Sequence, residues 1–137
     1  MKNKEITSLN NPELKFLISI RKNKIRRNEN KSIAEGYREN VQLINSNYEI
    51  DTLYVCSELF VGNNNFELID QFKIKQIRIV KLSKKVFNSL SYRDKPDGIL
   101  SLFITKKLTI EDFNLSGPIL VANSIEKPGN LLSLIHI

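Results

Sequence analysis

The sequence predicts an α/β fold, because strand-like and helix-like segments alternate along most of the chain. Runs rich in β-branched and aromatic residues are separated by segments whose apolar residues recur at helical spacing. Such alternation is typical of a layered domain with a partly parallel sheet. The composition supports a folded core, since 41% of the 137 residues are hydrophobic and 26% are charged, as in ordinary globular proteins. This length suits one domain, or one small domain and part of another.

The first helix is expected to begin at Pro12, because Asn11 is a good N-cap and proline is tolerated in the first turn. Four residues then follow at helical spacing: Leu14, Leu17, Ile18 and Arg21. Residues 21–31 have almost no apolar periodicity and carry many basic side chains. They are predicted to form an exposed helix end and loop.

A short strand at 32–34 is expected to end at the turn made by Glu35 and Gly36. The next segment, 37–45, has helical spacing, and Val41 and Ile44 should face inward. The β-rich run DTLYVC predicts a strand at 51–56, and a helix is expected at 66–72.

The run QIRIVKL at 76–82 alternates apolar and polar residues, as a half-buried strand does. Ser83 can cap a helix that extends to Ser89. The apolar run GILSLFIT predicts a strand at 98–105, where the first domain, residues 1–105, is expected to end.

Residues 106–117 are polar and mixed, and they are predicted to be a linker. Gly117 and Pro118 punctuate the chain, and an apolar strand is expected at 119–122. Residues 118–131 are therefore expected to start a second domain.

Positive charge is concentrated at the start of the chain. Residues 1–40 carry ten Lys/Arg and five Asp/Glu, a net charge of +5, whereas residues 41–137 carry eleven and ten, a net charge of +1. This asymmetry indicates a polyanion partner, either nucleic acid or an anionic membrane surface. A solvated basic helix face is the alternative, and the charge pattern does not separate the two.

Other observations exclude several classes of protein. The sequence contains no apolar run of the roughly 20 residues that a membrane span needs, and its first residues do not resemble a secretion signal. A single cysteine, Cys56, excludes an internal disulfide and suits a reducing cytoplasm. One cysteine and one histidine leave no credible zinc site, so no metal is expected.

Three stretches of the chain, residues 6–38, 90–103 and 119–131, together resemble the SpoU (TrmH) RNA methyltransferases of the SPOUT class. The opening ITSLNNPELKFLISIRKNKIRRNENKSIAEGYR has a Ser-x-x-Asn-Pro start, a basic segment and then Glu-Gly-x-Arg. LSYRDKPDGILSLF is similar to the segment where a Pro-x-Gly turn leads into the last strand of the first domain. ILVANSIEKPGNL looks like the first catalytic motif of the family. The three stretches occur in the order of the family and cover most of the chain.

The resemblance implies that residues 1–105 form an RNA substrate-binding domain. Its fold would be a three-layer α/β/α sandwich similar to kink-turn-binding ribosomal proteins. Residues 118–131 would contain the first strand of a truncated, knotted SPOUT domain. The full-length parent would be a cytoplasmic homodimer that uses S-adenosylmethionine to methylate ribose 2′-hydroxyls, of rRNA ahead of tRNA. This chain would be a monomeric fragment that binds RNA, lacks the cofactor site and is inactive by itself.

Two other functions remain open. The first is a stand-alone RNA-binding module of the ribosomal-protein type, although such a module would end near Thr105. The second is an α/β domain with a basic surface that does not bind RNA, which leaves the three stretches unexplained.

The candidate site residues combine charge with position in these stretches. The expected RNA-binding residues are Lys15, Arg21, Lys22, Lys24, Arg26, Arg27, Glu35 and Arg38. The basic members can neutralise phosphates. Glu35 has two possible roles: it contacts RNA hydroxyls, or it bonds backbone or arginine groups near the Gly36 turn. The resemblance assigns Asn130 to the active site, but position 136, where the family has arginine, is His136.

Several other residues are expected to be structural. Gly36 and Gly98 should serve backbone geometry, and Cys56 should be a small core residue. Tyr37, Tyr48, Tyr54 and Tyr92 could stack on bases, although scattered aromatics in an α/β domain usually lie in the core or at its rim.

The last six residues, LSLIHI at 132–137, depart from the family pattern. They are one translation of the transposon end that is used to fragment DNA for sequencing libraries. We therefore expect residues 132–137 to be a sequencing-adaptor artefact rather than protein-coding sequence.

Overall fold

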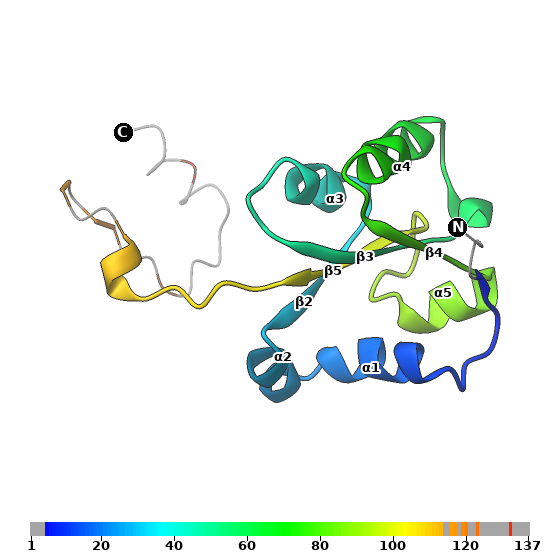
Figure 1. The fold of residues 1–137 in the computed structure, drawn as a ribbon, viewed down its shortest axis with the longest axis horizontal. Coiled ribbons are helices and arrows are strands. Elements are labelled where there is room, and N and C mark those ends of the chain that lie inside the picture. Colours follow the sequence, from blue (N-terminus) through cyan, green and yellow to red (C-terminus); the bar gives the residue numbers. More distant parts are fainter. Residues whose placement is uncertain (1–4, 114–115, 118, 121–122, 124–131, 133–137) are drawn as a thin grey trace. The chain divides into compact units, whose positions relative to one another are not determined.

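A five-stranded mixed sheet with helices on both faces forms the first part of the chain (Figure 1). The computed structural model describes residues 5–113, 116–117, 119–120, 123 and 132. The chain divides into two units, Met1–Lys107 and Leu108–Ile137. The strands of the first unit are β1 (Glu5–Ile6), β2 (Lys31–Glu35), β3 (Ile50–Val55), β4 (Arg78–Leu82) and β5 (Ile99–Ile104). Its helices are α1 (Pro12–Ile20), α2 (Asn23–Glu29), α3 (Tyr37–Ile44), α4 (Asn64–Ile74) and α5 (Lys84–Leu90), with a 3₁₀ turn at Ser57–Leu59.

The strand order is β1-β4-β3-β5-β2. β4 pairs in parallel with both β1 and β3, whereas β5 runs antiparallel to both β3 and β2. The expected α/β fold with a partly parallel sheet is therefore confirmed.

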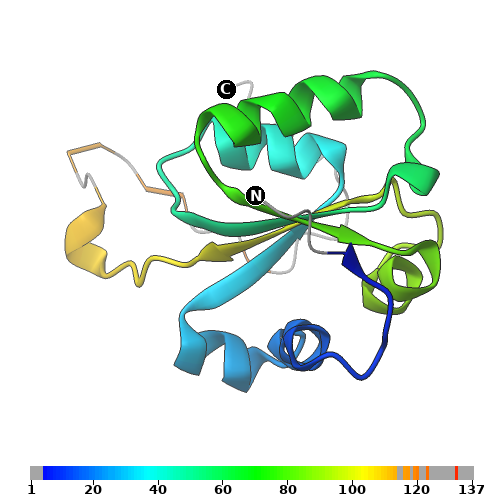
Figure 2. The ribbon, with the colours of Figure 1, turned by 45° about the vertical axis from the view of Figure 1, so that its right-hand side comes forward.

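Each face of the sheet has its own apolar core, because successive side chains of a strand point to opposite faces. On β3, Tyr54 packs with the cluster that contains buried residues of α1 and α5, whereas Leu53 and Val55 pack with those of α3 and α4. Figures 1 and 2 show the same arrangement, with α1, α2 and α5 below the sheet and α3 and α4 above it. The basic segment therefore lies in the layer of α1 and α5.

The predicted elements of the first unit are present within a few residues of their expected bounds. α1 begins at Pro12 with the Asn11 side chain accepting a hydrogen bond from the Glu13 amide at 2.8 Å. Ser83 occupies the N-cap position of α5, but its side chain makes no capping hydrogen bond.

Three expectations about elements were wrong or incomplete. The segment predicted as a loop contains the helix α2. Ile18 lies outside the buried stripe of α1, which consists of Leu14, Leu17 and Ile20, and 41% of Ile18 is exposed. The strand β1 has only two residues and was not expected; it exists because it pairs with β4, far away in the sequence.

In the second unit, the described residues include a 3₁₀ turn, Ile110–Asp112, with a capping box between Thr109 and Asp112. Ile119 and Leu120 are not in a strand, contrary to the expectation for 119–122, and residues 121–122 lie outside the described part. Asn130, which was predicted to be catalytic, and most of the tail, 133–137, also lie outside it. No helix in the described part of the chain is long and apolar enough to cross a membrane.

Candidate nucleic-acid interface

Most of the expected basic contact residues lie on the surface of the α1–α2 layer. Lys15, on α1, and Lys22, Lys24 and Arg27, on or next to α2, are exposed, whereas Arg26 is half-buried. Arg38 is also exposed, but it lies in the first turn of α3 on the opposite face of the sheet. The structure therefore groups five of the predicted cations and separates Arg38 from them.

α2 is a helix although it has no fully buried residue. Its first turn forms when the Lys22 carbonyl accepts hydrogen bonds from the amides of Ile25 and Arg26, at 3.0 and 3.1 Å. Ile25 packs against the core cluster of α1 and α5. Asn30 ends the helix in the left-handed region, with φ of 50°, a conformation that asparagine tolerates better than most residues. The Ile25 contact and the hydrogen-bonded ends of α2 therefore hold the helix in place, and its basic residues remain on the surface.

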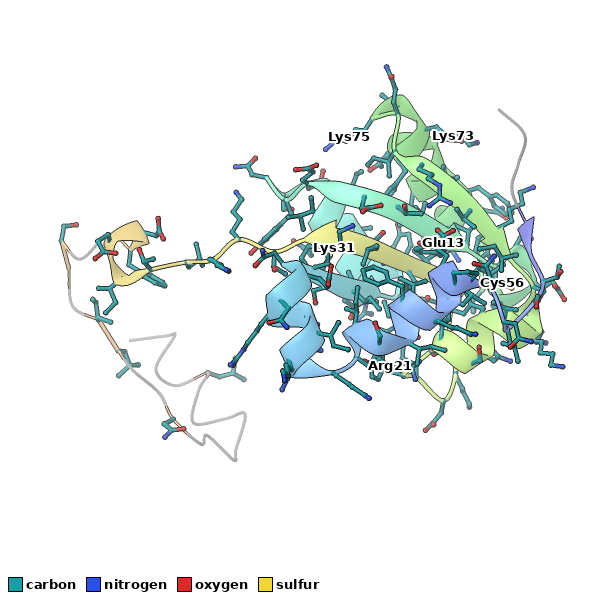
Figure 3. All side chains as sticks on the ribbon, turned by 60° about the horizontal axis from the view of Figure 1, so that its bottom comes forward. Glu13, Arg21, Lys31, Cys56, Lys73 and Lys75 are labelled. Atoms are coloured by element: carbon teal, nitrogen blue, oxygen red, sulfur yellow. The ribbon has the colours of Figure 1, made fainter. Side chains whose placement is uncertain are left out.

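Arg21, labelled in Figure 3, makes its hydrogen bonds within the protein, to residues at the end of α5. Its Nη2 donates to the carbonyl oxygens of Ser89 at 3.3 Å and Ser91 at 3.2 Å, and also to that of Leu90. These carbonyls belong to the end of α5, where the last turn has no partners within the helix. A guanidinium there satisfies the carbonyls and complements the negative end of the helix dipole. Arg21 therefore joins α1 to α5.

The loop 91–98 after α5 is fixed by residues at the end of β2. The Glu35 carboxylate accepts a hydrogen bond from the Tyr92 amide at 2.8 Å and another from the Ser91 hydroxyl. Of the two roles open to Glu35, the structure thus displays the bonding of backbone near the Gly36 turn. At the other end of the loop, Asp97 accepts a hydrogen bond from the Tyr37 amide at 2.7 Å.

Gly36 allows the end of β2 to pack closely against the loop 91–98. Its φ is 107°, and a Cβ atom there would lie 2.4 Å from the Arg93 guanidinium. That guanidinium also forms an ion pair with Glu39 at 2.7 Å. Gly98 has φ of 79°, and a Cβ atom there would lie 2.3 Å from the Cys56 carbonyl oxygen. The expectation that both glycines serve backbone geometry is confirmed.

Two other cations near this layer are neutralised by carboxylates. Lys31 pairs with Asp51 at 2.5 Å. Burial acts to raise the pKa of Asp51, but hydrogen bonding and charge from Lys31 outweigh it and hold that pKa below its usual value. Arg78 pairs with Glu13 at 2.6 Å, and Glu13 also accepts the Tyr54 hydroxyl. Burial and Glu13 raise the pKa of Tyr54. These pairs link β2 to β3 and α1 to β4.

Sequence comparison identifies the family to which this α/β domain belongs. A family model described as the MRM3-like substrate binding domain matches residues 11–101. The chain belongs to this family. A search of curated proteins found no match to the chain.

Solved structures have the same fold as this substrate-binding domain. A structure described as an RNA 2′-O ribose methyltransferase is 29% identical, with a TM-score of 0.66, over 93% of this chain and 48% of that one. An rRNA methyltransferase from Sinorhizobium meliloti is 21% identical, with a TM-score of 0.62, over 75% of this chain and 37% of that one. Its AdoMet-bound form is also 21% identical, with a TM-score of 0.65, over 80% of this chain and 40% of that one. The chain therefore spans less than half the length of each. The resemblance to SpoU-type methyltransferases is confirmed.

The aromatic and thiol residues of the substrate-binding domain are divided between core and surface. Tyr54 and Cys56 are buried, and burial raises the pKa of the Cys56 thiol, so its expected core role is confirmed. Tyr48 is 39% exposed and lies edge-on against Phe103. Tyr92 is 58% exposed, and the Arg21 guanidinium carbon lies 4.4 Å from the centre of its ring.

An open hollow of about 380 Å³ lies at the start of α4, lined by Tyr37, Val61, Gly62, Asn64, Asn65 and Asp97. Its polar groups already serve the fold, since Asn65 donates to the Asp97 carbonyl at 3.2 Å and Asp97 holds the Tyr37 amide. It is therefore a poor fit for S-adenosylmethionine. Within the described ranges no group of His, Cys, Asp and Glu side chains could hold a metal ion.

Proposed function

We propose that residues 1–105 bind the RNA substrate of an S-adenosylmethionine-dependent ribose 2′-O-methyltransferase, with rRNA ahead of tRNA as the substrate. The observation that carries this proposal is the match of residues 11–101 to a substrate-binding domain family. The names of the similar structures support the finer parts, because they include an RNA 2′-O ribose methyltransferase and an AdoMet-bound rRNA methyltransferase.

The α1–α2 surface would hold the RNA backbone. Lys15, Lys22, Lys24 and Arg27 are exposed, and each can neutralise a phosphate, which makes binding salt-dependent and independent of sequence. Arg26 would contribute its exposed part. Arg38 would act only on RNA that reaches the other face of the sheet, beyond the Glu35–Gly36 turn.

The finer fold assignment belongs to the same proposal. The three layers would be those of the kink-turn-binding ribosomal proteins, which suits a structured RNA. Residues 118–131 would start the knotted domain of a homodimeric, cytoplasmic parent enzyme, with Asn130 helping to hold its active site. Domain boundaries at 105 and 117 and an artefactual origin of residues 132–137 are also part of the proposal.

The methyl donor would be bound outside the described residues. S-adenosylmethionine supplies an electrophilic methyl group when bound, but the described hollow does not suit it and we assign no cofactor contact to this domain. The contribution of the domain would be to place a ribose by binding its RNA, which raises the effective concentration of the reacting hydroxyl. We therefore expect this chain to bind RNA without methylating it.

The proposal is tested by neutralising Arg26 and Arg27. Glutamine is preferable to glutamate, because both arginines lie in the last turn of α2, where a negative side chain would destabilise the helix. The matched control is Lys73→Gln with Lys75→Gln on α4, which removes the same charge from the opposite layer (Figure 3).

Binding of a structured rRNA hairpin would be measured by fluorescence anisotropy between low and physiological salt. We expect Arg26→Gln with Arg27→Gln to reduce the slope of log affinity against log salt by about 0.7–0.9 for each lost phosphate contact. The Lys73/Lys75 control should bind like the wild type. Equal slopes for both double variants and the wild type would contradict the proposed surface.

A further inference from the structure

Tyr92 is the exposed aromatic residue that the basic layer supports most directly. The ring lies in the loop after α5 and is 58% exposed. The Arg21 guanidinium carbon lies 4.4 Å from the ring centre, within the range of a cation–π contact. Since Arg21 also bonds the carbonyls at the end of α5, the cation is held against the ring.

The peptide group that precedes the ring is fixed as well, and the Arg93 amide that follows it donates to the Ser91 hydroxyl oxygen at 2.9 Å. The Tyr92 amide donates to the Glu35 carboxylate at 2.8 Å, and the preceding Ser91 carbonyl accepts from Arg21 at 3.2 Å. The hydroxyl of Ser91 donates to the other oxygen of Glu35. A ring presented in this way loses little conformational entropy when a partner binds, because its backbone is already ordered.

The surroundings of the ring select its partner. Lys22 follows Arg21 in the chain, and Lys95 lies three positions after Tyr92; both lysines are exposed, whereas the Arg93 guanidinium is paired with Glu39. A second cation stacked on the ring would be repelled by Arg21, whereas an uncharged nucleobase would not, and its phosphates would be attracted by the neighbouring lysines. Aromatic rings among basic residues are how proteins bind unpaired bases.

We propose that Tyr92, held by Arg21 and Glu35, is a stacking platform for an unpaired nucleobase of the bound RNA. This inference rests on the proposed function, since it assumes that the α1–α2 layer binds RNA. It adds that the RNA presents a single-stranded base to the loop after α5, so a loop or bulge binds better than a continuous duplex.

The test compares two RNA probes with the full 137-residue chain. One probe is a hairpin with 2-aminopurine in its unpaired loop, and the other is a blunt duplex of the same stem sequence. The variants are Tyr92→Ala, which removes the ring, and Tyr92→Phe, which keeps it. Tyr48→Ala is the matched control, because Tyr48 is also partly exposed but lies before β3. Melting temperatures show that each variant is folded.

We expect Tyr92→Ala to bind the hairpin about 5- to 150-fold more weakly, with an unchanged salt slope and unchanged duplex binding. Tyr92→Phe and Tyr48→Ala should bind like the wild type. Loop fluorescence should be quenched by the wild type and should stay bright with saturating Tyr92→Ala.

Two results would overturn the inference. If Tyr92→Ala binds the hairpin like the wild type while neutralising Arg26 and Arg27 weakens it, Tyr92 is a rim residue and the proposed function stands. If the folded wild type binds neither probe, the proposed function fails and the stacking platform fails with it.

Discussion

The end of α1 and the last turn of α2 carry arginines of the same basic segment, yet the two places use them differently. Arg21 is directed into the protein, where it bonds three carbonyls at the end of α5 and contacts the Tyr92 ring. Arg26 and Arg27 lie in the last turn of α2, and Arg27 is exposed. Each of these arginines carries the same positive charge. Net charge therefore overstates the surface available to RNA, because part of the charge belongs to side chains that stabilise the fold.

Arg21→Ala is expected to have the largest effect on the free energy of unfolding. Loss of the contacts to α5 should reduce the free energy of unfolding by about 2 kcal/mol, because hydrogen bonds from a charged group are stronger than average. Urea denaturation measures this directly. Arg26→Gln with Arg27→Gln should change the same quantity by less than about 0.5 kcal/mol, as exposed substitutions usually do. Similar losses in the two variants would remove the distinction between the two places.

Glu35→Ala should have the next largest effect. Without the carboxylate, the Tyr92 amide loses its acceptor and the Ser91 hydroxyl loses one of two, which should cost about 1–2 kcal/mol in the free energy of unfolding. Glu35→Gln is the matched control, because its amide oxygen can still accept from the Tyr92 amide, and it should lose less than half as much. A full loss in Glu35→Gln would contradict this assignment, and weaker RNA binding by a stable Glu35→Gln variant would instead favour a direct role of the carboxylate in binding.

The smallest expected effect on the free energy of unfolding concerns Lys31, at the start of β2, whose charge is neutralised by Asp51 on β3. Asp51→Asn should reduce the free energy of unfolding by about 0.5 kcal/mol at neutral pH, a typical value for a partly exposed pair. The pKa of Asp51 is lowered in the folded chain, so the pair stabilises the fold above the ordinary aspartate pKa of about 3.9. This contribution is lost as the pH falls through the lowered value. Urea denaturation of the two proteins should therefore converge in acid, and a constant difference would contradict this assignment.

The fold class, most helices and strands, and the family could be predicted from the sequence alone. Apolar spacing locates α1, α3 and α4, and alternation locates β4, because these patterns reflect burial on one face of a regular element. Gly36 and Gly98 were also predictable as backbone positions, since positive φ values favour glycine. The motifs around Pro12, Gly36 and Gly98 lie within the range that the substrate-binding family model matches.

The remaining features, namely α2, β1 and the contacts of Arg21, depend on tertiary contacts. α2 has no buried residue and therefore no apolar period, and β1 depends on a partner more than seventy positions away, Glu5 pairing with Lys81. Arg21, Glu35 and Tyr92 meet because α1, β2 and the loop after α5 are adjacent in space, although they are separated by 14 to 71 positions in the sequence. A local pattern records which residues are charged or apolar. It does not record which distant carbonyl a guanidinium reaches, and that contact separates an arginine that supports the fold from one that is free to bind RNA.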